Sequence, residues 1–211
     1  MLGKREESYL MEKILTIRPS SLTELQMGKV NRLASLGFEQ TEAEMYQDTK
    51  NHVLESEQIQ LSYVDEELKG FALYSSCIGG LAIELVGIVV EPQYQGRGFG
   101  SRLLAHYVDN NQPDYLTAYT RNPSTVGILN QYNGTFPINS SEELESIAGD
   151  MEGSELIDGV AYHIGRYGQD GLYGANDPAG RCLRGDDIAL KERFSKLSDP
   201  GSALVLAAKV D

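Results

Sequence analysis

The sequence has no tryptophan, only two cysteines and three histidines, and no apolar run that approaches the length of a membrane span. Because a membrane-spanning helix needs about 20 apolar residues, we expect no membrane association. Cys77 and Cys182 form neither a disulfide framework nor a Cys-x-x-Cys metal motif, so we expect two reduced thiols. His52, His106 and His163 are too scattered to predict a metal site. The first 13 residues mix both charges and lack the apolar core of a signal peptide, which favours a cytoplasmic location.

Positive charge is scarce as well. The chain has 18 Lys and Arg against 31 Asp and Glu, a net charge of −13 and a pI near 4.7. Binding to phosphate backbones requires clustered cations, so we expect neither nucleic acid nor an anionic membrane as a partner. Residues 87–107 differ from this average, because the segment contains two cations, Arg97 and Arg102, and only one anion, Glu91. An anion can settle in that segment.

What is present is typical of a globular protein of one domain: 211 residues, 41% hydrophobic and 23% charged. The patterns predict alternating strands and helices up to Pro137. In order, these are a strand from Ile14, a helix capped by Ser20 or Ser21 and ending at Gly37, a helix at 41–56, a hairpin of 59–64 and 69–75, an apolar strand at 84–90, a helix from about Gly100, a strand at 115–121, and a helix at 123–132.

Beyond Pro137 the predicted elements are sparser. They are a helix at 140–151 capped by Ser140, strands at 159–168 and 202–210, and a long loop at 169–187. A hairpin that leads into a strand–helix–strand unit indicates a mixed sheet with helices on its faces.

The most informative segment is Gln95-Gly96-Arg97-Gly98-Phe99-Gly100, which joins the apolar strand to the following helix. Glycines let the backbone approach a ligand, and a helix N-terminus offers free N–H groups, so this turn predicts a phosphate site. A nucleotide P-loop is excluded because no lysine follows the glycines. A dinucleotide site fits poorly, since Ser101 stands where a glycine is needed and Arg121 where an acid is needed. A purely structural turn also stays open.

The order Gln-x-x-Gly-x-Gly, preceded by Gly87-Ile88-Val89-Val90-Glu91-Pro92, resembles the acyl-CoA-binding segment of the GNAT N-acyltransferase superfamily. The element order over residues 14–137 is similar too. The resemblance implies an α/β (mixed α+β) fold: a central mixed, mostly antiparallel sheet of about six to seven strands, flanked by helices, with splayed central strands. It implies an N-terminal extension at 1–13 and one domain at 14–211, atypical from about residue 138.

For binding, the resemblance implies acetyl-CoA as co-substrate and no metal. The loop N–H groups and the Ser101 hydroxyl would hold the pyrophosphate, the strand backbone would pair with the pantetheine arm, and one asparagine would contact the cofactor or cap the next helix. These residues are Gln95, Gly96, Arg97, Gly98, Phe99, Gly100 and Ser101 in the loop, Ile88, Val89 and Val90 in the strand, and Asn122.

For catalysis, Glu84 is the predicted general base. It lies 11 residues before Gln95, which resembles the base of the histone acetyltransferase branch, and burial in an apolar strand would raise its pKa. The alternative is a Glu84 that faces solvent. Tyr132 is the predicted general acid, although the family spacing places Asn130 at that position, and Tyr119 is a weaker substitute.

The sequence thus predicts an N-acetyltransferase that acts on a primary amine by direct attack in a ternary complex. The acceptor is a small-molecule amine, a peptide N-terminus or a lysine. A non-catalytic acyl-CoA-binding or regulatory module remains the alternative, and an NAD(P)-binding oxidoreductase is a weaker one. Residues 138–199 are expected to shape either the acceptor site or a subunit contact, such as that of a homodimer.

Overall fold

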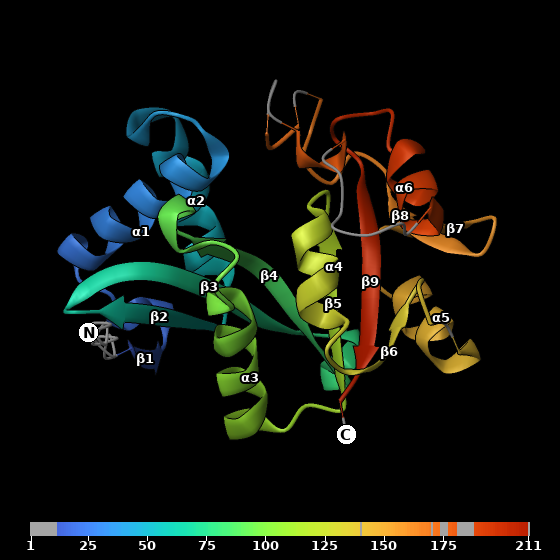
Figure 1. The fold of residues 1–211 in the computed structure, drawn as a ribbon, viewed down its shortest axis with the longest axis horizontal. Helices are drawn as coiled ribbons and strands as arrows, with labels where there is room; N and C mark the ends of the chain where they lie inside the picture. Colours follow the sequence, from blue (N-terminus) through green and yellow to red (C-terminus); the bar gives the residue numbers. More distant parts are fainter. Residues whose placement is uncertain (1–11, 140, 170, 174–176, 181–187, 211) are drawn as a thin grey trace, which may run out of the picture.

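The computed structural model describes residues 12–139, 141–169, 171–173, 177–180 and 188–210. Cys182, most of the expected N-terminal extension and part of the long loop lie outside these residues. The described chain folds as one large sheet with helices packed on its faces (Figure 1). The strands are β1 (Glu12–Ile17), β2 (Gln58–Val64), β3 (Glu67–Cys77), β4 (Ala82–Val90), β5 (Tyr115–Thr120), β6 (Asn133–Phe136), β7 (Ser154–Ile157), β8 (Val160–His163) and β9 (Ala203–Lys209).

The strand order is β1-β2-β3-β4-β5-β9-β8-β7, with β6 also paired to β9. Every neighbouring pair is antiparallel except β4 and β5, which are parallel. The predicted mixed, mostly antiparallel sheet is therefore confirmed, with nine strands instead of six or seven. The predicted list had no β6 or β7, which are only four residues long each.

The helices are α1 (Glu24–Phe38), α2 (Glu42–Glu55), α3 (Phe99–Asn111), α4 (Pro123–Leu129), α5 (Glu142–Gly149) and α6 (Ile188–Ser195). One buried cluster joins α1 and α2 to β2 and β3, and a second joins α5 to β5 and β9. A third cluster joins α3, α4 and α6 to the sheet. On β3 it contains Ala72 and Tyr74, whereas the first cluster contains Phe71 and Leu73. Because successive strand residues point to opposite faces, α1 and α2 lie opposite α3. None of the described helices is long and apolar enough to cross a bilayer.

Three predicted helix boundaries were wrong. Thr23, not Ser20 or Ser21, caps α1 in a reciprocal box with Gln26, because residues 19–21 form a separate 3-10 turn. Ser141 rather than Ser140 caps α5. The helix expected to reach residue 132 ends at Leu129, since the next residues turn into β6, whose Gly134 has φ of 74°.

The central strands β4 and β5 separate partway along their length. They pair only where residues 82–84 face residues 115–117. Beyond that point β4 stays on β3 as far as Val90, while β5 continues along β9. A shift in the β3–β4 register leaves Val86 as an extra residue, and such a bulge bends a strand. The result is a V-shaped opening between β4 and β5, the predicted splay.

Candidate functional site

The glycine loop shapes the entrance to α3. Gly96 and Gly98 have φ of 71° and 77°, a left-handed region that favours glycine, and Gly98 is the N-cap of α3. Gly100 lies close to α4: a Cβ there would come within 2.7 Å of the end of the Ile128 side chain, which would have to shift. The glycine loop therefore leads directly into the N-terminus of α3, where the first backbone N–H groups have no partner within the helix. This is the geometry of an anion site.

Side chains hold this loop in place. The Gln95 amide donates to the Val90 carbonyl at 3.0 Å, and the Phe99 ring packs edge-on against Tyr94. Arg102 donates to the Arg97 carbonyl at 2.9 Å, so it fixes the loop backbone. The exposed Arg97 guanidinium lies over the Tyr94 ring, 5.7 Å from its centre. Arg97 thus places a positive charge at the rim of the loop.

A cavity of about 340 Å³ lies along this loop and α4. Nine of the eleven residues predicted to bind the cofactor line it: Ile88, Val90, Gln95, Gly96, Gly98, Phe99, Gly100, Ser101 and Asn122. The Asn122 side chain also caps α4 by accepting from the Ser124 N–H at 2.9 Å. Val89 lines the next cavity, and Arg97 lines neither.

Two more cavities continue from the first. A narrow one of about 100 Å³ occupies the V between β4 and β5, and it shares Ile88, Asn122 and Thr125 with the loop cavity. On its other side it shares seven residues with a cavity of about 590 Å³: Met45, Asp48, His52, Val86, Tyr119, Tyr167 and Leu172. Because neighbouring cavities share wall residues, the three lie side by side along the opening where the central strands part, and together they are called the groove.

Glu84 stands at the apex of the V, in the last pair of β4 with β5. Its side chain is 14% exposed and lines the large cavity, so the solvent-facing alternative does not hold. Burial raises the pKa of Glu84, and the Arg166 guanidinium opposes that rise from 3.2 Å. The carboxylate is thus a stronger base than a free glutamate.

Arg166 follows β8 and was not among the predicted site residues. Besides Glu84, it contacts the face of the Tyr119 ring, with its guanidinium carbon 4.3 Å from the ring centre. The adjacent Tyr167 donates its hydroxyl to the Tyr119 carbonyl at 3.1 Å, and burial raises the pKa of Tyr167. Tyr167 lines both the narrow and the large cavity. The strand expected at 159–168 ends at His163, so these two residues belong to the loop that follows it.

Tyr132, the predicted general acid, lies elsewhere. It packs against the buried cluster under α3, and its hydroxyl has no hydrogen-bond partner among the described residues. It lines none of the three cavities. Asn130, which the family spacing places at this position, is exposed at the end of α4. The position of Tyr132 therefore does not support its predicted role as the general acid.

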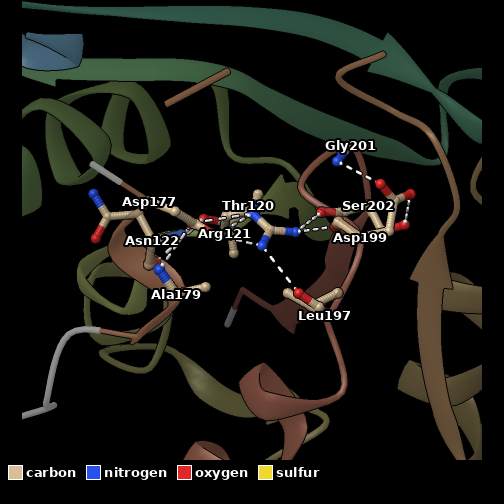
Figure 2. A network of polar contacts seen from close by, with 9 residues as sticks. All are labelled: Thr120, Arg121, Asn122, Asp177, Ala179, Leu197, Asp199, Gly201 and Ser202. Atoms are coloured by element: carbon tan, nitrogen blue, oxygen red, sulfur yellow. Dashed lines mark hydrogen bonds and ion pairs between the residues drawn. The ribbon is translucent and has the colours of Figure 1, made fainter. Parts of the chain in front are cut away.

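The region after β5 is tied to the groove by Arg121, which is 2% exposed (Figure 2). Its guanidinium donates to the Asp177 carboxylate at 2.5–3.1 Å. It also donates to the carbonyls of Leu197, Asp199 and Ser202 at 2.6–3.1 Å. One side chain therefore joins the end of β5 to the segments on both sides of α6. A search of the described residues finds no group of His, Cys, Asp and Glu placed to hold a metal.

Comparison with solved structures gives many likenesses, among them the following three, each at low identity. The chain is similar to an IAA acetyltransferase from Bacillus cereus (11% identity, 95% of this chain and 100% of that one, TM-score 0.48). It is similar to the ribosomal-protein-S18-alanine N-acetyltransferase from Escherichia coli (12%, 95% of each chain, TM-score 0.48). It is also similar to ElaA of Escherichia coli (17%, 61% of this chain and 89% of that one, TM-score 0.49). No curated protein matches the sequence.

The family model described as the acetyltransferase (GNAT) family matches residues 29–117. This range runs from α1 to β5 and includes the glycine loop, Glu84 and the splayed part of β4. Through this segment the chain resembles the acetyltransferase (GNAT) family, which is a family of acetyl-transferring enzymes.

Proposed function

We propose that the protein transfers an acetyl group from acetyl-CoA to a primary amine, by direct attack of the amine while both substrates are bound. One observation carries this: a single groove has an anion site at one end and a buried carboxylate, Glu84, at the other. Acetyl-CoA supplies the activated thioester. Residues 14–211 would act as one domain, since β9 joins β5 to β8 in the same sheet.

The donor side of the groove fits a pyrophosphate followed by a long arm. The N–H groups of residues 95–100 would bind the two phosphates, with the Ser101 hydroxyl beside them and Arg97 adding charge. In the V, the β5-facing edge of Ile88, Val89 and Val90 lacks a strand partner, because β5 has turned away. A backbone N–H there can pair with an arm and polarise a carbonyl.

On the acceptor side, Glu84 would take the proton that the amine nitrogen loses as the new N–C bond forms and the C–S bond breaks. The departing thiolate needs one proton in return. Tyr132 remains the prediction from the family motif for that donor. Tyr167 is the better-placed tyrosine, because it lines the narrow cavity between the donor and acceptor ends; its hydroxyl would have to turn from the Tyr119 carbonyl, to which it donates.

The test is release of CoA from acetyl-CoA in the presence of a panel of primary amines, with binding of CoA measured by calorimetry. We expect Glu84→Gln to bind CoA normally and to lose turnover. Gly98→Val should lose CoA binding, because valine is strained at φ of 77°. Gly28→Ala, on the open side of α1, is the matched control. Undiminished CoA affinity in Gly98→Val, or full turnover in Glu84→Gln, would contradict the proposal.

A further inference from the structure

The large cavity is strongly acidic. Five carboxylates line it, against one guanidinium and one imidazole: Glu44, Asp48, Glu55, Glu84 and Glu152, with Arg166 and His52. A cavity of about 590 Å³ is large enough for a small molecule. Since all these charges surround one space, an occupant of that space experiences their summed field.

Most of this charge comes from one face of α2. Glu44, Asp48, His52 and Glu55 are three or four residues apart, so they form one row along the helix. At about 1.5 Å per residue, the row is about 16 Å long. A ligand that uses the whole row must be extended.

The cations of the cavity neutralise that row only in part. Arg166 is bound to Glu84 and to the ring of Tyr119, both on the sheet side. His52 lies on the row itself, with its Nδ1 3.0 Å from the Asp48 carbonyl and 3.4 Å from the Asp48 carboxylate. Glu55 and Glu152 are exposed to the cavity without an ion pair among the described residues. The α2 side therefore keeps a negative excess.

A second observation, independent of the acids, also points to a ligand. Thr49, on α2, is only 5% exposed and lines the narrow cavity. Its hydroxyl has no hydrogen-bond partner among the described residues. A buried hydroxyl without a partner is costly, so an occupant that donates to it gains affinity. The narrow and large cavities meet at Asp48 and His52, on either side of Thr49 in the chain.

We infer that the acceptor is an extended aliphatic amine with at least two ammonium groups, one amine placed at Glu84 and a second cation along the acidic row of α2. This rests on the proposed function and names its acceptor class. Both nitrogens arrive charged. The one near Glu84 loses a first proton to solvent before it attacks and a second to Glu84 as the N–C bond forms, whereas the other keeps its charge. Attraction between unit charges falls with distance and dielectric, and the partly enclosed row retains more of it than bulk water does.

The experiment compares three probes that differ only at the far end of the chain: 1,5-diaminopentane, pentylamine and 5-aminopentanoate. We expect kcat/KM for the diamine to exceed that for pentylamine by about tenfold, the factor that corresponds to about 1.4 kcal/mol. The aminopentanoate should be the poorest of the three. Equal values for diamine and pentylamine, or a preference for the carboxylate probe through Arg166, would overturn the inference.

Variants locate the effect. Glu55→Gln and Glu152→Gln change exposed side chains in the cavity, and each should shrink the ratio of diamine to pentylamine severalfold. Glu42→Gln changes an exposed residue of the same helix that does not line the cavity, so the ratio should be kept.

Calorimetry with CoA present separates this inference from the proposed function. Binding of the diamine that weakens in Glu55→Gln, without acetylation of any probe, would support the acidic acceptor site and refute the acetyl transfer. If the diamine binds no better than pentylamine, the inference fails whatever the turnover is.

Discussion

Replacement of Arg121 by methionine is expected to be the most damaging single change outside the groove. Methionine keeps much of the volume but none of the five N–H donors of arginine. The change would leave the Asp177 carboxylate without this cation and three backbone carbonyls without this donor. All of these partners are tied to one guanidinium (Figure 2).

The cost follows from burial. Removing one partner of a buried ion pair costs about 3–5 kcal/mol. The Arg121 side chain is 2% exposed but that of Asp177 is 30% exposed, so water can compensate part of the loss at the acid. We therefore expect Arg121→Met to lose about 3–4 kcal/mol of unfolding free energy. A domain with a total of about 5–15 kcal/mol would survive, but with little margin.

Urea denaturation followed by circular dichroism measures this loss as a lower midpoint at a constant slope. Asp177→Asn should cost less, since the arginine keeps its three carbonyls. Arg32→Met, at an exposed position of α1, should stay within about 0.5 kcal/mol of the parent. A loss below about 1 kcal/mol in Arg121→Met would refute the reasoning. The same variant should also lower turnover, because the Gly201 carbonyl beside this network accepts from the Tyr167 N–H, next to Arg166.

Three other predictions concern the groove and the helix that forms its wall. Because burial raises the pKa of Glu84, the folded protein loses stability as pH rises from the ordinary glutamate pKa to this higher value. Glu84→Gln should remove this loss of stability in thermal denaturation measured against pH. The same variant should also remove the rise of kcat/KM with pH. Tyr167→Phe should lower kcat more than Tyr132→Phe does, and a larger effect at Tyr132 in steady-state kinetics would restore the motif-based assignment. Thr41→Ala removes the capping box of α2 and should cost about 1 kcal/mol in urea denaturation, whereas Ala43→Ser, on the exposed first turn, should cost far less.

The donor half of the site could be predicted because its chemistry depends on backbone. Gly96 and Gly98 have positive φ in the structure, and residues other than glycine are strained at such angles. The glycines in the sequence therefore indicate this backbone conformation. These features are local, and local sequence records them. The parting of β4 and β5 was predicted only through the family resemblance.

The acceptor half could not be predicted in this way. Arg166 and Tyr167 come from a loop whose residues show no periodicity, and they reach Glu84 only because β8 and β9 extend the sheet. His52 lies on a helix whose amphipathic pattern is the same whether its polar face meets solvent or a ligand. Tyr132 was predicted because it is the tyrosine at the end of the helix expected at 123–132, but α4 ends at Leu129 and Tyr132 lies beyond it. Long-range contacts of this kind leave no signal in a single sequence.

The place of β9 in the sheet has a consequence for synthesis. β9 is the last of the described strands to leave the ribosome, yet it lies between β5 and β8 and also pairs with β6. The glycine loop and β1–β5 can pair before it appears, whereas β8 has no sheet to join until residues 203–209 are made. The nascent chain can therefore form the glycine loop before the wall that contains Arg166 and Tyr167, and the groove is completed in one late step.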